Sequence, residues 1–327
     1  MTVKTKSVPA PRPVRREPLG QPRRRKGMKG SLILTTSVAV VLVVGGCSSG
    51  SAPRGPDATP TPGDNRPSSE HSPVTVLSGR IVFDNLQDVW SMKADGTGLT
   101  HLTHSTGPDF DATWSPDGEM IAFRSERRGD SEIWLMHTDG SGQHRLTRGL
   151  APAWSPDGAL IAFAGPSGSS GFITLVRPDG TGLRQLPHTE GGEYPSWSPD
   201  GTRIAFNSNL TGDHLMFVAE ADGSKVVGPV GAGDGWQVDW SPDGRSILFT
   251  SHRDYPDPQH SDLYLMRPDG SDVRRLTHQG AETPAWSPDG QHIVFSYGGL
   301  FVVNADGTGV TPLPTHVGET ELPDWTG

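Results

Sequence analysis

Cysteine is almost absent from this chain of 327 residues, and the single example is Cys47. One cysteine excludes a disulfide within the chain and a metal cluster held by several thiolates. Apolar residues make up only 33% of the sequence, and aromatic residues only 7%. The main run of apolar and weakly polar residues, 32–44, is shorter than the roughly 20 residues that cross a membrane as a helix.

Positive charge is scarce outside the N-terminal segment. Residues 1–46 hold ten Lys/Arg and one acid, Glu17, which leaves 18 basic and 36 acidic residues for the rest of the chain. A body with this excess of acid repels phosphate backbones, so nucleic-acid binding is not expected. The charge suits a soluble surface or a cationic partner instead.

The N-terminal segment reads as an export signal. Basic residues at 23–29 precede the apolar run 32–44, and small residues follow it. This order is typical of a secretory signal, which we predict over residues 1–46, with Met28 as an alternative start. The stretch Val44-Gly45-Gly46-Cys47 resembles the bacterial lipobox, although an uncleaved anchor is the other interpretation. The resemblance implies a lipid on Cys47 and a protein held at the membrane, facing the periplasm or the cell exterior.

Residues 47–78 contain few apolar side chains and many Ser, Pro, Gly, Asp and Thr. Such a segment buries too little apolar surface to fold by itself. We predict a disordered tether here and a folded domain over residues 79–327.

The pentapeptide Trp-Ser-Pro-Asp-Gly organises the remainder of the chain. Its copies begin at Trp114, Trp154, Trp197, Trp240 and Trp286, and a degraded sixth copy contains Trp325. Successive tryptophans are 40, 43, 43, 46 and 39 residues apart. A period of this length indicates a repeat architecture.

Each repeat contains four short apolar segments separated by turn residues. A segment ending in Trp is followed by a triplet such as Ile121-Ala122-Phe123. A third segment such as Ile133-Trp134-Leu135-Met136 follows, and then a fourth that ends near Leu-Thr, as at Leu146. Asp-Gly pairs join the third and fourth segments, as hairpin turns do. Four antiparallel strands per repeat predict an all-β, six-bladed propeller, closed by pairing the last strand, near 322–325, with the first, near 80–83.

The repeat, from Leu-Thr-His through Trp-Ser-Pro-Asp-Gly to Ile-Trp-Leu-Met and Asp-Gly, resembles that of the TolB family. It is shared more loosely with the propellers of dipeptidyl-peptidase-type enzymes. The resemblance covers residues 79–327. It implies that the Trp-bearing strands line a central channel and that the propeller is a docking platform for other proteins.

Antiparallel blades place their connections on two faces. Loops after the first and third strands are short and uniform, whereas those after the second and fourth vary, as functional loops do. We therefore expect binding at the channel mouth on the variable side. The candidate residues precede the tryptophans: Asp109, Asp111, Glu193, Tyr194, Trp236, Asp239, Glu282 and Glu321. Asp239 and Asp324 adjoin Trp directly, so they face either the channel or a neighbouring blade.

Four histidines recur after the fourth strands, at His104, His188, His278 and His316. Imidazole and carboxylate are ligands for Zn, Mn or Fe, but a propeller spreads these four around its ring. We expect no metal and no cofactor.

Three functions follow. The first is a non-catalytic, monomeric scaffold that binds a protein or a cell-envelope polymer through its variable side. The second is a glycan-active or metal-dependent enzyme that uses the acids and histidines at the mouth. The third is a purely structural surface protein.

Overall fold

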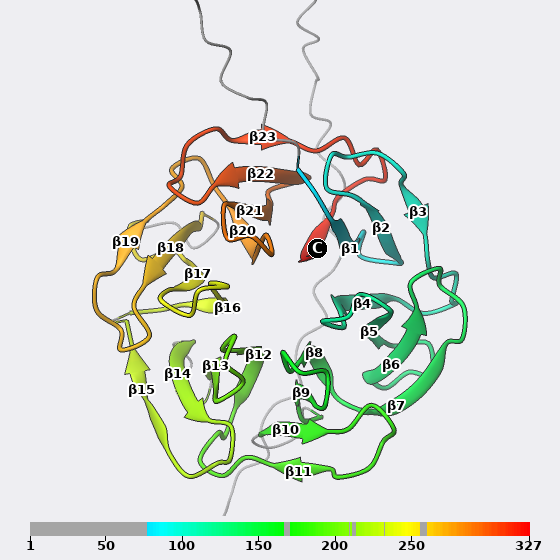
Figure 1. Ribbon diagram of the computed structural model, residues 1–327, viewed down its shortest axis with the longest axis horizontal. Helices are drawn as coiled ribbons and strands as arrows, with labels where there is room; N and C mark the ends of the chain where they lie inside the picture. The colour runs from blue at the N-terminus through cyan, green and yellow to red at the C-terminus, as the bar shows by residue number, and fades with distance from the viewer. Residues whose placement is uncertain (1–76, 167–170, 209, 211–213, 232, 256–259) are drawn as a thin grey trace, which may run out of the picture. The chain divides into compact units, whose positions relative to one another are not determined.

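The structure is a computed structural model that describes residues 77–327, apart from 167–170, 209, 211–213, 232 and 256–259. This part of the chain contains 24 strands in six four-stranded antiparallel sheets. The sheets stand radially around a central channel, like the blades of a propeller (Figure 1). The predicted six-bladed fold is confirmed.

Each blade begins at the channel and ends at the rim. Blades 1 to 3 comprise β24 (Glu321–Thr326), β1 (Arg80–Asp84), β2 (Val89–Lys93) and β3 (Thr100–His101); β4 (Asp109–Trp114), β5 (Met120–Ser125), β6 (Glu132–His137) and β7 (His144–Arg148); and β8 (Leu150–Trp154), β9 (Ile161–Ala164), β10 (Ile173–Val176) and β11 (Arg184–Gln185). Blades 4 to 6 comprise β12 (Gly192–Trp197), β13 (Arg203–Ser208), β14 (Leu215–Glu220) and β15 (Val226–Val230); β16 (Trp236–Trp240), β17 (Ile247–Ser251), β18 (Asp262–Met266) and β19 (Arg274–Arg275); and β20 (Glu282–Trp286), β21 (His292–Ser296), β22 (Leu300–Asn304) and β23 (Thr311–Pro312).

Blade 1 is built from both ends of the described chain. The last strand, β24, pairs antiparallel with β1, and Ile81 lies opposite Trp325. The indole Nε1 of Trp325 also donates to the carbonyl of Ser78 at 2.9 Å, and Leu77 packs against the same core. The predicted closure is confirmed, and ordered contacts begin two residues before the expected start of the domain.

The core lies between successive blades. The second strands repeat Ile-x-Phe, and their isoleucines and phenylalanines are 0–3% exposed. Between blades 1 and 2, for example, Val82, Val89 and Leu102 pack against Trp114 and Phe123. Burying an apolar side chain of this size stabilises a fold by about 1.5–3 kcal/mol, so these interfaces hold the ring together.

The Ser-Pro-Asp-Gly turns follow one hydrogen-bond scheme, shown here by blade 4. The Ser198 hydroxyl donates to Asp200 Oδ1 at 2.6 Å, and the backbone N–H groups of Thr202 and Arg203 donate to Asp200 and Ser198. These bonds, above all the one from Ser198, lower the pKa of Asp200 to about 2. The motif is therefore explained by its turn.

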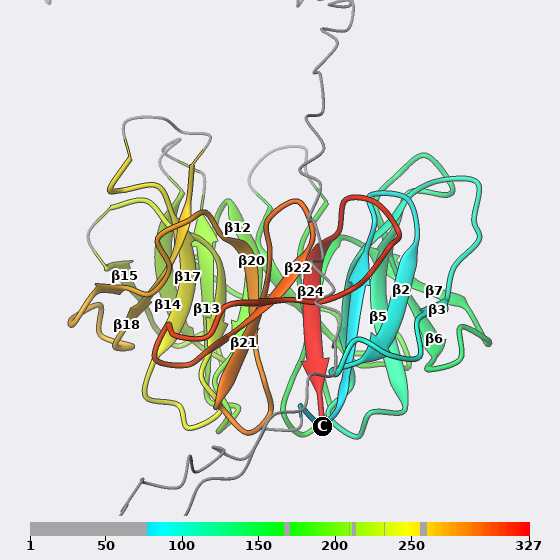
Figure 2. The same cartoon turned by 90° about the horizontal axis from the view of Figure 1, so that it is seen from above.

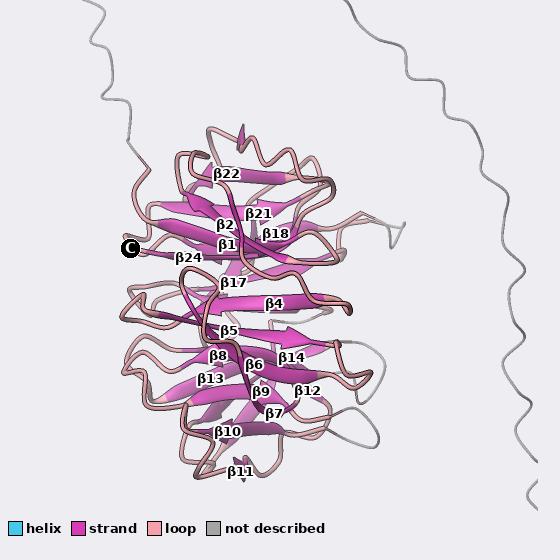
Figure 3. Cartoon of the chain, turned by 90° about the vertical axis from the view of Figure 1, so that its right-hand side faces the viewer, coloured by secondary structure: helices cyan, strands magenta, loops and turns pink. Residues whose placement is uncertain are grey.

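All Ser-Pro-Asp-Gly and Asp-Gly turns lie at the same end of the ring, which we call the turn face. The loops after the second and fourth strands lie at the opposite end, the variable face (Figure 2). The inner strands run from the variable face to the turn face, where the C-terminus lies. Seen from the side, strands fill the body of the ring and loops its two ends (Figure 3).

The rim strands are shorter than expected. In blades 1, 3, 5 and 6 they end one residue before the buried leucines Leu102, Leu186, Leu276 and Leu313. Each leucine turns inward after the strand, which leaves only two residues in each edge strand. Short edges discourage pairing with other chains.

The predicted signal, the lipid site at Cys47 and most of the tether lie outside the described residues. Among the residues that are described, no helix has the length and apolar character to cross a membrane.

Candidate functional site

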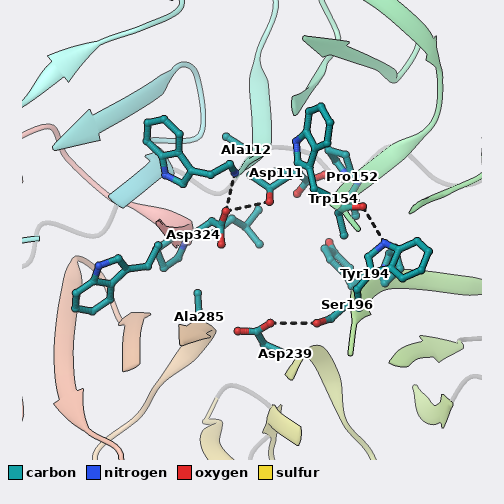
Figure 4. Close-up of a pocket in the computed structure, with 18 of the residues that line it drawn as sticks. Asp111, Ala112, Pro152, Trp154, Tyr194, Ser196, Asp239, Ala285 and Asp324 are labelled. Carbon is teal, nitrogen blue, oxygen red and sulfur yellow. Dashed lines mark hydrogen bonds between the residues drawn. The ribbon is translucent and has the colours of Figure 1, made fainter. Parts of the chain in front are cut away.

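Six inner strands line the channel, and each places equivalent residues at three levels. The level nearest the turn face holds the residue before each tryptophan, and we call it the tie ring: Thr113, Ala153, Ser196, Asp239, Ala285 and Asp324. Asp324 accepts the backbone N–H of Trp114 at 2.7 Å and the hydroxyl of Thr113 at 2.9 Å. Both donors belong to the next blade (Figure 4). Asp324 therefore ties blade 1 to blade 2.

Asp239 has the same role in blade 5. It accepts the Ser196 hydroxyl from blade 4 at 3.1 Å and the Trp286 N–H from blade 6 at 2.9 Å. Burial raises the pKa of Asp239 to about 7, against the lowering effect of these bonds. Of the two orientations expected for Asp239 and Asp324, the structure shows both carboxylates bound to neighbouring blades.

Every inner strand bulges at the third residue before its tryptophan, which is two residues before the tie-ring residue. The bulged residues have φ between 45° and 52° and form the bulge ring: Asp111, Ala151, Tyr194, Gln237, Thr283 and Leu322. The strand pairing shifts register at the same point in all six blades. Left-handed backbone at residues other than glycine costs about 1–2 kcal/mol each, so the ring holds strained backbone at the channel.

Side chains of the bulge ring offset part of this strain by bonding to the next blade. Asp111 accepts the N–H of Ala151 at 3.1 Å, and Gln237 accepts that of Thr283 at 3.2 Å. The tie and bulge rings together line a cavity of about 320 Å³.

The third level is the mouth ring, which opens on the variable face. Its residues, in order around the ring from blade 2 to blade 1, are Phe110, Leu150, Glu193, Trp236, Glu282 and Glu321. Two apolar residues are therefore adjacent in blades 2 and 3, and two acids in blades 6 and 1. All six side chains are half-buried. Three carboxylates and three apolar groups therefore surround the opening, an arrangement suited to an amphipathic guest.

Acid is concentrated where blades 6, 1 and 2 meet. Partial burial, together with Glu282, Glu319 and Asp111, raises the pKa of Glu321. Burial also raises the pKa of Asp111, although Arg124 lies 3.8 Å from it and acts in the opposite direction. Opposite Glu321, on the neighbouring strand β1, lies Asp84, whose pKa is raised well above its usual range by burial and by Asp111.

Seven of the eight acidic and aromatic candidates lie on the channel wall or its mouth: Asp111, Glu193, Tyr194, Trp236, Asp239, Glu282 and Glu321. Asp109 does not. It is fully buried and pairs with Arg127 at 3.0 Å, behind the wall. Burial raises the pKa of Tyr194, which stands among the channel acids.

Two residues of the mouth ring and one residue next to it were missed by sequence reasoning. Phe110 and Leu150 are apolar, and a search for chemically active residues passes over them. Asp84 ends the triplet strand of blade 1, where the other blades have Arg124, Ala164, Asn207, Thr250 and Ser296. Comparing that position across the repeats would have singled it out.

The recurring histidines remain apart. His104, His188, His278 and His316 stand on the loops after β3, β11, β19 and β23, in four different blades. Within the described ranges, no group of three or more His, Cys, Asp or Glu residues is placed to hold a metal ion. A separate pair, His214 and His252, packs edge-on against Trp236, with ring centres at 5.9 and 4.3 Å.

Relatives in sequence match short segments. An uncharacterized protein, Atu1656, of Agrobacterium fabrum is 39% identical over 66 residues, 20% of this chain and 22% of its own length. A TolB homolog of Chlorobium luteolum is 36% identical over 72 residues, 22% of this chain and 15% of its own. An uncharacterized peptidase, YuxL, of Bacillus subtilis is 34% identical over 61 residues, 18% of this chain and 9% of its own. This chain thus spans less than a quarter of the length of these relatives.

Solved structures share the fold. TolB from Acinetobacter baumannii is similar with a TM-score of 0.67 and 22% identity, over 76% of this chain and 67% of that one. The tricorn protease is similar with a TM-score of 0.59 and 19% identity, over 73% of this chain and 26% of that one. The propeller therefore occurs both in TolB and within an enzyme.

The sequence also matches the family described as the TolB beta propeller domain, over residues 75–235 and 148–327. Together these matches cover all six blades, and the chain belongs to the TolB β-propeller domain family.

Proposed function

We propose that this protein is an exported, lipid-anchored binding scaffold, without catalytic activity, that holds a protein partner at its variable face. The observation that carries the proposal is the mouth ring. Three half-buried carboxylates and three half-buried apolar side chains surround one opening on a rigid ring. Interfaces of this mixed character suit a polar, reversible protein contact.

The location of the mouth supports a binding role. The tie and bulge rings fix the inner strands to one another, so the mouth residues are held by the ring and not by loops alone. A preorganised surface loses little conformational entropy when a partner binds.

Among the relatives, a protein of Geobacter sulfurreducens named for the Tol-Pal system is 40% identical over 60 residues, 18% of this chain and 14% of its own length. Its name places that protein in the Tol-Pal system.

The anchor and the location are proposed from the sequence. Cys47 and the tether would hold the propeller at the membrane, on the periplasmic or outer side, where cell-envelope proteins and polymers are within reach. A protein is the preferred partner because the acidic mouth attracts cationic side chains.

The test is capture of partners by the full chain in membranes. Cross-linked eluates are compared for the wild type, for a mouth variant (Glu193→Gln, Trp236→Ala, Glu282→Gln, Glu321→Gln) and for a control. The control (Glu119→Gln, Glu220→Gln, Asp272→Asn) removes an equal number of negative charges, three, at the turn face. We expect a specific protein that the mouth variant alone loses. Identical eluates from all three would refute the proposal.

A further inference from the structure

Asp84, at the end of β1 next to the mouth ring, is a carboxylate without an ion-pair partner among the described residues. Its side chain is 0% exposed, and Oδ1 accepts the backbone N–H of Leu86 at 3.1 Å. Its second oxygen, Oδ2, has no close hydrogen-bond partner among the described residues, although the backbone N–H of Asp111 is near enough to act on the carboxyl and oppose the rise in its pKa. Among the described residues, no lysine or arginine lies within ion-pair distance of it. Buried carboxylates are seldom left in this state, so the missing partner requires an explanation.

The charged neighbours of Asp84 are themselves acids. In the strand register, Asp84 lies directly opposite Glu321 on β1 and β24, and residues that lie opposite each other have their side chains on the same side of the sheet. Asp111 contributes the larger repulsion, after burial, and Glu321 adds to it. The nearby cation, Arg124, forms ion pairs with Asp111 and Glu126 instead. A local excess of negative charge therefore lies between blades 1 and 2.

The fold does not need a carboxylate at this position. Five other blades place Arg124, Ala164, Asn207, Thr250 and Ser296 there, on the same strand position and with the same ring geometry. Blade 4 carries the neutral amide isostere, Asn207, which is fully buried and, like Thr250 in blade 5, has side-chain polar atoms without a hydrogen-bond partner among the described residues. The charge of Asp84, more than its missing partner, therefore distinguishes blade 1. Asp84 thus adds a destabilising charge that packing alone does not account for, as binding groups often do.

We propose that Asp84, Glu321 and Asp111 form a subsite for the ammonium or guanidinium group of a lysine or arginine side chain on the partner protein. This rests on the proposed function and specifies the chemistry of its anchor. Glu321 is half-buried on the inner strand and meets the cation first, and Asp84 lies opposite it on the next strand outward, with a free oxygen. A multi-donor cation satisfies that oxygen and neutralises the repulsion among the three acids. The apolar stem of the guest side chain remains in the mouth.

The experiment uses two synthetic peptides that differ in one group, acetyl-Ala-Leu-Lys-Ala-amide and its Gln counterpart. Each is titrated into the full chain in detergent micelles, and binding is followed by NMR of a ¹³C label next to the Lys or Gln head group. We compare the wild type with Asp84→Asn and with Glu190→Gln, which removes one carboxylate elsewhere on the variable face. Glu321→Gln is a second site variant, and it tests the same subsite if Asp84→Asn does not fold.

We expect the lysine peptide to bind the wild type at least tenfold more tightly than the glutamine peptide. Asp84→Asn or Glu321→Gln should abolish this preference, while Glu190→Gln should change it less than twofold. Equal losses in site and control variants would show that only net charge matters, and an unaltered preference in the site variants would equally overturn the subsite. Capture of a partner that depends on the mouth but not on Asp84 would leave the proposed function standing without this anchor.

Discussion

The Asp239 carboxylate in blade 5 accepts the backbone N–H of Trp286 in blade 6 at 2.9 Å. Its other oxygen accepts the Ser196 hydroxyl in blade 4 at 3.1 Å. One side chain therefore connects three consecutive blades. A residue that resembled a ligand-binding acid in the sequence is a structural tie.

Replacing Asp239 by alanine should lower the free energy of unfolding by about 1–3 kcal/mol, because the buried Trp286 N–H loses its acceptor. Asp239→Asn keeps one oxygen and one donor in place and should cost far less. Urea unfolding at pH 7 measures both, with the exposed Asp130→Ala as a control expected to stay within about 0.5 kcal/mol of the wild type. Equal effects of the alanine and asparagine substitutions would contradict the tie.

The same carboxylate predicts a pH dependence. Burial raises the pKa of Asp239 to about 7 in the folded state, above its value near 3.9 in an unfolded chain. The protonated form is thus favoured by folding, so the stabilisation is fully present below about pH 4 and is lost as the pH rises towards 7. Denaturation midpoints measured from pH 4 to 8 should fall less steeply for Asp239→Asn than for the wild type. Parallel profiles would show that Asp239 does not titrate in this range.

The ring was predictable from the sequence because its determinants are local and repeated. Pro and Gly in the Trp-Ser-Pro-Asp-Gly turn set the hairpin, and the Ile-x-Phe triplets set the buried face. The offset between the first triplet and the last tryptophan was enough to predict the pairing of β1 with β24. No comparable signal marks the bulge ring, because Tyr194 and Leu322 are unlikely residues for left-handed backbone.

The candidate site was predictable only in outline. Their position before the tryptophan predicted that Glu282 and Glu321 lie at the channel mouth, and in the structure each begins an inner strand. It did not separate Asp109, which pairs with Arg127 behind the wall, from Asp111, two residues later in the channel. The bulge at Asp111 changes the alternation of side chains along β4, and alternation is what sequence reasoning relies on.

Close contact between blades gives a further prediction at Gly140, in the hairpin of blade 2. A Cβ there would lie 2.5 Å from the Leu102 carbonyl oxygen in blade 1, and φ is 83°. Gly129 has a similar φ of 86° but open space around it. Both alanine variants pay for left-handed backbone, about 1–2 kcal/mol, and only Gly140→Ala must also displace a neighbouring blade. Thermal unfolding should therefore show a clearly larger fall in melting temperature for Gly140→Ala than for Gly129→Ala. Equal falls would show that the neighbouring blade moves away from the added Cβ without measurable cost.

The stability of the whole ring depends on the closure of blade 1, where β24 pairs with β1. Removing residues 320–327 deletes β24, exposes the edge of β1 and takes the buried Trp325 from its core. Because each blade packs on two neighbours, we expect the loss to spread around the ring and unfold it in one cooperative transition at lower temperature. Trp325→Ala is the milder variant and should cost about 3–5 kcal/mol, whereas Thr326→Ala, on the same strand but half-buried, should have little effect. Calorimetry of all three against the wild type measures this, and a truncated chain with an unchanged melting curve would mean that β24 is not needed to close the propeller.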